Sequence, residues 1–151
     1  MLYCQFGEDR DHRGAPGVTK PHYEEVTRNI RVAVEPNFLE DQSEPEESRY
    51  LWSYHITIEN KGAETVQLLS RYWRITDSRG RVREVRADGV IGEQPILKPG
   101  QMFEYTSGAP LETPSGFMTG TYRMRAASGE SFEIGIPMFA LESPYEVRRV
   151  H

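Results

Sequence analysis

The sequence predicts an all-β protein, an antiparallel β-sandwich of about seven strands. Several short segments alternate apolar and polar residues, as strands with one buried face do. Turn residues separate these segments at intervals of about 8–12 residues, a spacing typical of sandwiches. No segment shows the i, i+3, i+4, i+7 apolar spacing of an amphipathic helix.

Length and composition favour one acidic domain. The 151 residues suffice for a single core. A net charge of −5 and a pI of about 5.4 disfavour binding to nucleic acid or to anionic lipid, which both require a basic face. The single cysteine, Cys4, excludes an intrachain disulfide and suits a reducing cytoplasm, where we expect the protein. No apolar run approaches the ~18–20 residues of a membrane span, and no apolar signal-peptide core is present, so we expect no membrane insertion.

The chain divides into a predicted domain and two terminal segments. The N-terminal segment mixes charges with glycine and proline without periodicity, so Asp9, Asp11 and His12 are interpreted as solvated charges rather than metal ligands. The expected divisions are a flexible extension at 1–21, a β-sandwich domain at 22–147 and a tail at 148–151.

The first predicted strand covers residues 29–35, with Ile30, Val32 and Val34 on one face. Pro36 disfavours its continuation as a central strand, although the chain could prolong it at a sheet edge. The acidic run that follows, residues 40–47, lacks the fixed spacing and glycine of a calcium-binding loop and is interpreted as a solvated loop.

Residues 50–59 form a second predicted strand, with Trp52, Tyr54, Ile56 and Ile58 on one face. His55 falls on the opposite face, a place more typical of a hydrogen-bonded surface residue than of a metal ligand.

The centre of the chain is rich in strand formers. Residues 66–76 predict a strand that buries Leu69, Trp73 and Ile75, with an irregularity near Ser70. A turn at 77–80 leads to a return strand with Val82 and Val85.

The last predicted strands cover residues 102–107, 117–125 and 131–136, with Pro137 ending the last one and an extended tail at 139–151. The residues expected to be mostly buried are Trp52, Tyr54, Ile56, Ile58, Leu69, Trp73, Phe132, Ile134 and Ile136.

A glycine-rich loop at residues 86–95 approaches the G-x-G-x-x-G pattern that holds phosphates, with Ala87 in place of the first glycine. Such a pattern needs a helix after it to supply amides, whereas Pro95 follows here. We therefore interpret the loop as a recognition surface and keep a small-anion or nucleotide site as the alternative. The candidate ligand- or partner-binding residues are Arg86, Asp88, Gly89, Gly92 and Lys98.

Several motifs in order give the chain a resemblance to a known family. The motifs are LLSRYWRITDSRGRVREVRADGVIGEQPILKPGQMFEYTSG at 68–108, NKG at 60–62, LETPSGFMTGTY at 111–122 and IPMFAL at 136–141. Together they are similar to the bacterial ApaG family over about residues 24–147. The sequence departs from the family at Ala87, where glycine is common, and at Tyr72, where histidine is common.

The resemblance implies an immunoglobulin-like or fibronectin-III-like sandwich. It also implies an association with Co²⁺/Mg²⁺ efflux. Related domains are attached to F-box proteins and to a DNA polymerase delta-interacting protein, where they look like protein-binding modules.

The expected function is that of a non-enzymatic interaction module. Nucleophilic catalysis needs a nucleophile beside a base and an orienting group, and no such set is recognisable. His12, His22 and His151 fall in predicted tails, and no Cys/His cluster suits a transition metal, so we expect no metal site and no cofactor. The expected partner is an unidentified protein, with self-association through a sheet edge or the tail as a further expectation.

Overall fold

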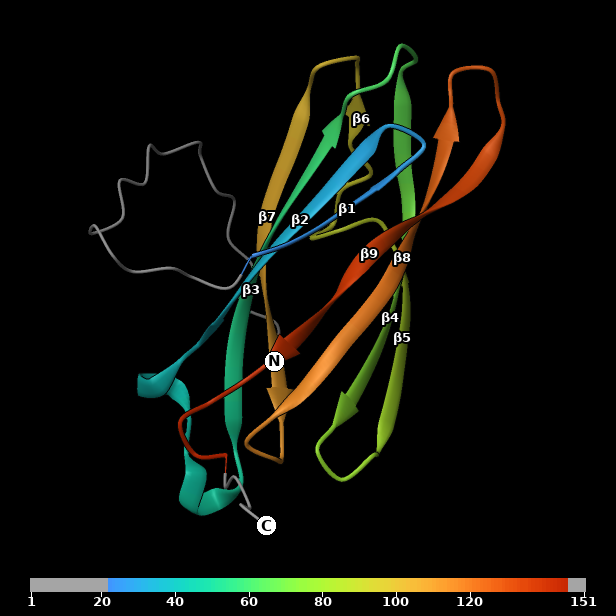
Figure 1. Cartoon of the computed structure of the whole chain (residues 1–151). Helices are drawn as coiled ribbons and strands as arrows, with labels where there is room; N and C mark the ends of the chain where they lie inside the picture. The colour runs from blue at the N-terminus through green and yellow to red at the C-terminus, as the bar shows by residue number, and fades with distance from the viewer. Residues whose placement is uncertain (1–21, 147–151) are drawn as a thin grey trace, which may run out of the picture.

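The computed structural model describes residues 22–146, which form a sandwich of two antiparallel β-sheets (Figure 1). The strands of these residues are β1 (Tyr23–Thr27), β2 (Ile30–Phe38), β3 (Tyr50–Asn60), β4 (Val66–Asp77), β5 (Val82–Asp88), β6 (Ile96–Leu97), β7 (Met102–Leu111), β8 (Gly116–Ala126) and β9 (Ser131–Leu141). Two short 3-10 helices are η1 (Glu40–Gln42) and η2 (Pro45–Glu47). No helix within 22–146 is long and apolar enough to cross a membrane. The predicted sandwich is confirmed, while the extension at 1–21 and the tail at 148–151 lie outside the described residues.

The strands pair in two sheets. The first sheet has the order β1-β2-β3-β7 and the second the order β5-β4-β8-β9, with β6 paired to the start of β4. Along the strands, apolar and polar residues alternate as predicted, and the apolar faces of the two sheets pack against each other. Val32 pairs with Ile58, and Ile56 pairs with Tyr105, so apolar residues form continuous rows across the first sheet.

The core agrees with the sequence prediction at seven of its nine residues. The buried members of that prediction are Trp52, Tyr54, Ile56, Ile58, Trp73, Ile134 and Ile136. Leu69 and Phe132 are only partly buried and are not members of the buried core. The pairing of β4 with β8 shifts between Leu68 and Ser70, and this bulge turns Leu68 into the core in place of Leu69. Phe132 instead lies under the guanidinium of Arg28, whose carbon is 4.1 Å from the ring centroid.

Two prolines lie inside strands rather than at their ends. β2 continues through Pro36, at a point where β1 no longer pairs with it, so the missing amide interrupts no ladder on that side. β9 continues through Pro137 to Leu141, which corrects the expectation that Pro137 ends the strand. There the pairing with β8 shifts between Met118 and Gly120, and the resulting bulge accommodates the proline.

The two long sides of the sandwich differ. On one side β9 lies against β1 and β2. The backbone amide of Gly135 donates to the Thr27 hydroxyl at 3.1 Å, and that of Ala140 donates to the Tyr23 hydroxyl at 3.3 Å. Side chains of β1 therefore satisfy amides along the edge of β9. On the other side, which we call the open side, the edge strands are β5 and β7.

A buried pair of tyrosines joins the two sheets. The hydroxyl oxygens of Tyr105 in β7 and Tyr122 in β8 lie 2.5 Å apart. Burial raises the pKa of both phenols well above the ordinary value. Both side chains therefore remain protonated in the folded protein over the physiological pH range.

The C-terminal end of the described chain is held against the first sheet. The Trp52 indole Nε1 donates to the carbonyl oxygen of Glu142 at 2.8 Å. The ring of Tyr145 lies against the rings of Phe38 and Tyr50, at centroid distances of 6.0 and 6.2 Å. Residues 142–146 are thereby fixed beside η1 and η2.

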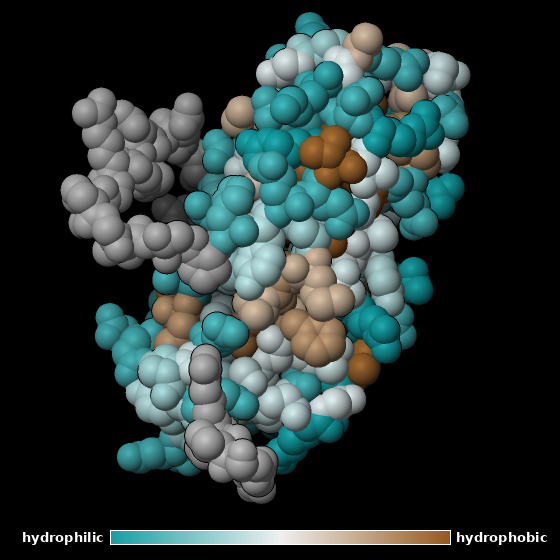
Figure 2. Space-filling view, viewed as in Figure 1, coloured by the Kyte–Doolittle hydropathy of each residue, from teal (hydrophilic) through white to brown (hydrophobic). Residues whose placement is uncertain are grey.

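Exposed apolar side chains are scattered over several elements. Figure 2 shows a mainly hydrophilic face with a small apolar patch near its middle. The large apolar residues with the greatest exposure among those described are Val26, Val82, Ile96, Met102, Phe117, Met138 and Tyr145. They come from seven different segments, so isolated exposure of this kind marks no large apolar interface.

Candidate binding groove

Two connected cavities lie along the open side, between β5 and β7. The larger has a volume of about 880 Å³ and the smaller about 470 Å³. Ile75, Arg83 and Pro110 line both cavities, so together they form one groove, which we call the seam groove. It runs from the region of η2 to the loop at 86–95.

The floor of the seam groove is apolar. Trp73 and Ile75 reach it from β4 and Tyr105 and Ala109 from β7, and all four belong to the hydrophobic core. Val85 adds a half-buried apolar wall from β5. The groove therefore opens onto the edge of the core, where a ligand would contact both sheets at once.

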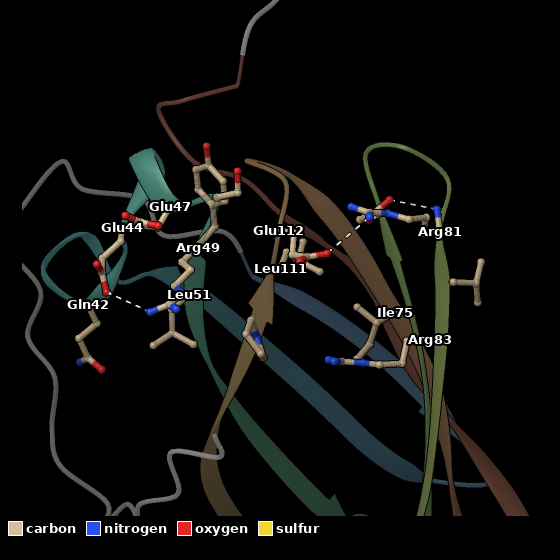
Figure 3. Close-up of a pocket in the computed structure, with 15 residues that line it drawn as sticks. Gln42, Glu44, Glu47, Arg49, Leu51, Ile75, Arg81, Arg83, Leu111 and Glu112 are labelled. Carbon is tan, nitrogen blue, oxygen red and sulfur yellow. Dashed lines mark hydrogen bonds and ion pairs between the residues drawn. The ribbon is translucent and has the colours of Figure 1, made fainter.

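Charged residues surround the end of the groove near η2 (Figure 3). The Arg81 guanidinium lies 2.7 Å from the Asp77 carboxylate and 3.4 Å from that of Glu112. Arg49 lies 3.6 Å from Glu44. Desolvation raises the pKa of the Asp77 carboxyl. The hydrogen bonds from Arg81 and Arg79 and the charge of Arg81 outweigh this effect, so the pKa is lowered overall. The rim thus carries both signs of charge, mostly paired within the chain.

Two arginines enter the groove itself. Figure 3 shows Arg83 extending from β5 across the groove toward β7. Among residues 22–146 its guanidinium has no hydrogen bond or ion pair. Arg71 instead donates to the carbonyl oxygens of Asp88 at 3.3 Å and of Gly89 at 2.7 Å, and so holds the loop from beneath. Arg83 is therefore the cation of the groove that is available to a ligand.

The predicted site residues separate into two groups. Asp88 and Gly92 line the smaller cavity, and Gly89 lies between them at the same end of the groove. Arg86 lies on the outer face of the second sheet, and Lys98 is exposed in the turn after β6. Neither Arg86 nor Lys98 lines the seam groove, so the structure brings together only three of the five residues.

The loop closes through a tight turn. Val90 and Glu93 exchange two backbone hydrogen bonds of 2.8 Å, and the residues between them have positive φ, 42° at Ile91 and 78° at Gly92. These values are typical of a type I′ turn, which favours glycine or asparagine at both positions. A β-branched residue with positive φ costs about 1–2 kcal/mol. Ile91 packs against the core and lines the groove, which offsets this cost.

Backbone amides of the loop are largely engaged within the chain. The amide of Gly89 donates to Leu69 O at 2.8 Å, and those of Val90 and Glu93 bond to each other's carbonyls. The element that follows is β6, a strand, rather than a helix. A phosphate cradle depends on free amides and a helix N-terminus, so this loop offers less to a phosphate than the sequence pattern implies.

Sequence reasoning missed Arg71, Arg83 and Ile91 as groove residues. The spacing of Arg83 and Val85 could have indicated Arg83, because residues two positions apart on a strand have their side chains on the same face. The sequence pattern does not show that β5 and β7 border the same side of the sandwich.

The other singled-out residues lie elsewhere. His55 is on the outer face of the first sheet, with Nε2 2.9 Å from Glu104 and Nδ1 2.8 Å from the Thr106 hydroxyl. Within residues 22–146, no group of three His, Cys, Asp or Glu side chains is placed to hold a metal ion. The acidic run forms η1 and η2, and its Glu44 and Glu47 line the groove.

Fold and groove together define a β-sandwich domain of the immunoglobulin and fibronectin-III type, with one closed and one open side. The family model described as ApaG domain matches residues 40–126. "Protein ApaG" of Rhodospirillum centenum is 63% identical over 123 residues, which cover 82% of this chain and 95% of that protein. "Protein ApaG" of Brucella anthropi is 57% identical over 129 residues, covering 85% and 99%. The chain belongs to the ApaG family.

A solved structure agrees with this assignment. The crystal structure of the putative ApaA protein from Bordetella pertussis is similar to the chain with a TM-score of 0.76 and 43% identity. The match covers 85% of this chain and 100% of the Bordetella chain. The sandwich is therefore shared at both the sequence and the structural level.

Proposed function

We propose that this ApaG-family domain is a non-enzymatic binding module that docks an extended segment of a partner protein in the seam groove. The observation that carries the proposal is the asymmetry of the two sides. The β1–β9 side is covered, whereas the β5–β7 side holds a continuous groove with an apolar floor.

The composition of the groove fits a polypeptide. Protein interfaces combine an apolar centre with a polar, charged rim. Here Trp73, Ile75 and Val85 supply the centre, and Arg81 and Glu112 belong to the rim. β5 and β7 border the two sides of the groove, so an extended segment lying between them would contact side chains from both sheets.

The metal-efflux association that the family resemblance implies would be indirect under this proposal. The domain would act on metal resistance by binding a protein of that system rather than by holding the metal. The engagement of both His55 ring nitrogens, by Glu104 and Thr106, supports this interpretation.

A peptide selection tests the proposal. Peptides selected against the full chain from a displayed random library are expected to lose binding at least about tenfold with Arg83→Glu, because that change reverses a groove cation that has no ion pair within residues 22–146. Arg125→Glu on the outer face of the second sheet makes the same charge change and is expected to leave binding intact. Peptides that bind the Arg83→Glu variant as tightly as the wild type would overturn the proposed site.

A small-anion, nucleotide or pyrophosphate site is the second candidate function. The observation that favours it is Arg83, whose guanidinium enters a groove that Gly92 also lines. NMR titration with ATP, GTP and pyrophosphate tests it. Saturable shifts at Gly89 and Gly92 below about 1 mM, lost in a folded Gly92→Val variant, would favour this candidate over the peptide groove.

A further inference from the structure

The edge of β5 differs from the edges of β1, β7 and β9. The edges of β1 and β9 cover each other, and β7 contains Pro110, which has no amide for a further ladder. Among the strands of residues 22–146, β5 pairs with β4 alone, and four of its seven residues are charged: Arg83, Glu84, Arg86 and Asp88. Charged side chains on an edge strand disfavour pairing with the strands of other molecules. The order of the charges along β5 therefore decides which partner strand and register remain favourable.

The backbone groups that face outward from β5 can be assigned. The amide of Asp77 donates to Arg81 O at 3.0 Å, and the amide of Gly89 donates to Leu69 O at 2.8 Å. Both bonds fit the register in which Trp73 pairs with Val85. Hydrogen bonding alternates along an antiparallel strand, so the odd-numbered residues of β5 bond to β4. The amides and carbonyls of the even-numbered residues point to the open edge: Val82, Glu84, Arg86 and Asp88.

The outward backbone groups of β5 can pair with the same groups of a second copy in one register. If two copies pair antiparallel about a two-fold axis at Val85, all seven residues of each β5 overlap. Glu84 then lies opposite Arg86 of the second copy, and this pair occurs twice by symmetry. Both residues belong to the outward-bonding set, so each such pair also exchanges backbone hydrogen bonds.

Neighbouring registers are unfavourable. Residues that pair across the two β5 strands must have their side chains on the same face of the joined sheet. The partner of a given residue can therefore shift only by two positions, and each such shift moves the two-fold axis by one residue. An axis at Glu84 opposes two glutamates, and an axis at Arg86 opposes two arginines. Like charges directly opposite each other destabilise a strand pair. The register with the fullest overlap is therefore also the one with complementary charges.

We propose that the partner of the β5 edge is a second copy of this chain, paired antiparallel about Val85 so that the second sheets of two molecules form one continuous sheet. Within the described residues, Arg86 and Glu84 form a long ion pair with each other, with Arg86 Nη2 3.9 Å from the Glu84 carboxylate, and their side chains are 75% and 54% exposed. Glu84 accepts a hydrogen bond from Tyr72, and Arg86 lies over the same ring. Tyr72 thus holds both charges beside the edge where the second copy would meet them.

This pairing is separate from the proposed groove. It uses the backbone edge of β5 and the outer-face residues Glu84 and Arg86, whereas Arg83 and Val85 turn into the groove. Loss of self-association would leave peptide binding testable in the monomer, and Arg83→Glu tests the groove alone.

A charge-reversal experiment with the full chain tests the pairing. Sedimentation equilibrium over a range of concentrations is expected to show a monomer–dimer equilibrium for the wild type, weakened by added salt. Glu84→Arg and Arg86→Glu each place like charges opposite each other twice, and each is expected to raise the dimer Kd at least about tenfold. An equimolar mixture of the two variants restores both opposite-charge pairs and is expected to recover dimers.

Matched controls separate this pairing from a general charge effect. Arg28 and Glu130 form an exposed ion pair of 2.9 Å between the turn after β1 and the turn after β8, so Arg28→Glu and Glu130→Arg make the same charge changes away from β5. Both are expected to leave the dimer Kd unchanged, with folding confirmed by circular dichroism. A wild type that stays monomeric, single reversals without effect, or a mixture that fails to recover dimers would each overturn the proposal.

Discussion

Gly89 and Gly92 lie three residues apart in the same loop, and both have positive φ, but their surroundings differ. A Cβ added at Gly89 would lie 2.3 Å from the carbonyl oxygen of Glu93. A Cβ added at Gly92 meets nothing within 4 Å. Gly89 therefore serves close approach of the two loop arms as well as a special φ, while Gly92 serves the φ value alone.

This difference predicts unequal costs for the same substitution. Gly89→Ala is expected to lower the free energy of unfolding by about 2–3 kcal/mol, because the clash with Glu93 adds to the cost of positive φ. Gly92→Ala is expected to lower it by only about 1 kcal/mol. Urea unfolding followed by circular dichroism measures both, and equal losses would contradict the assigned role of Gly89.

At the scale of the elements, β1 stabilises the second sheet through side chains rather than through a ladder. The hydroxyls of Tyr23 and Thr27 accept hydrogen bonds from amides of β9. Tyr23 also packs on Phe139, at a centroid distance of 6.1 Å. Removing a hydroxyl while retaining the shape isolates the hydrogen bond from the packing.

Tyr23→Phe and Thr27→Val are each expected to lower the free energy of unfolding by about 0.5–1.5 kcal/mol. Hydrogen exchange should accelerate at Ala140 in the first variant and at Gly135 in the second, because each amide loses its acceptor. Tyr145→Phe is the control, since its hydroxyl bonds Glu40 at an exposed site. Unchanged exchange at both amides would show that neither hydroxyl protects the edge.

The elements also show which parts of the structure local sequence could predict. The seven predicted strands are present, and the alternation is clearest in those at 29–35, 50–59 and 131–136. β1 (Tyr23–Thr27) was missed because its residues are half-buried or exposed and alternate weakly, so pairing with β2 rather than local pattern defines it. β6 was missed because it has only two residues. The bulge at Ser70 was expected, but which leucine it turns inward depends on the register with β8.

The candidate site was less predictable than the fold for the same physical reason. The glycines located the loop, because positions that need a positive φ are usually occupied by glycine and are therefore visible in the local sequence. The seam groove depends on which edge strands border the same side, and Arg83 and Pro110 meet there from segments far apart in the chain. No local periodicity encodes that juxtaposition.

At the scale of the whole molecule, the Tyr105–Tyr122 pair couples the stability of the sandwich to alkaline pH. Burial raises both phenol pKa values above their unfolded value of about 10. The unfolded chain therefore loses these protons first as the pH rises. The stabilising contribution is complete below pH about 10 and is lost above it.

The free energy of unfolding is expected to fall above pH about 10, by about 1.4 kcal/mol per pH unit for each of the two tyrosines. Guanidinium unfolding at a series of pH values from neutral to alkaline measures this slope. The variant Tyr105→Phe/Tyr122→Phe should have a smaller slope, because it no longer carries the two groups. Equal slopes for the two proteins would refute the linkage.

The placement of the two tryptophans gives the molecule a pair of intrinsic optical reporters. The chain has only Trp52 and Trp73. Trp52 is hydrogen-bonded to Glu142 at the C-terminal end, whereas Trp73 lies in the floor of the seam groove. With Trp52 replaced by phenylalanine, the emission spectrum would respond to groove occupancy. With Trp73 replaced instead, it would respond to release of residues 142–146. Unlabelled protein can thus distinguish ligand docking from loosening of the chain end by fluorescence alone.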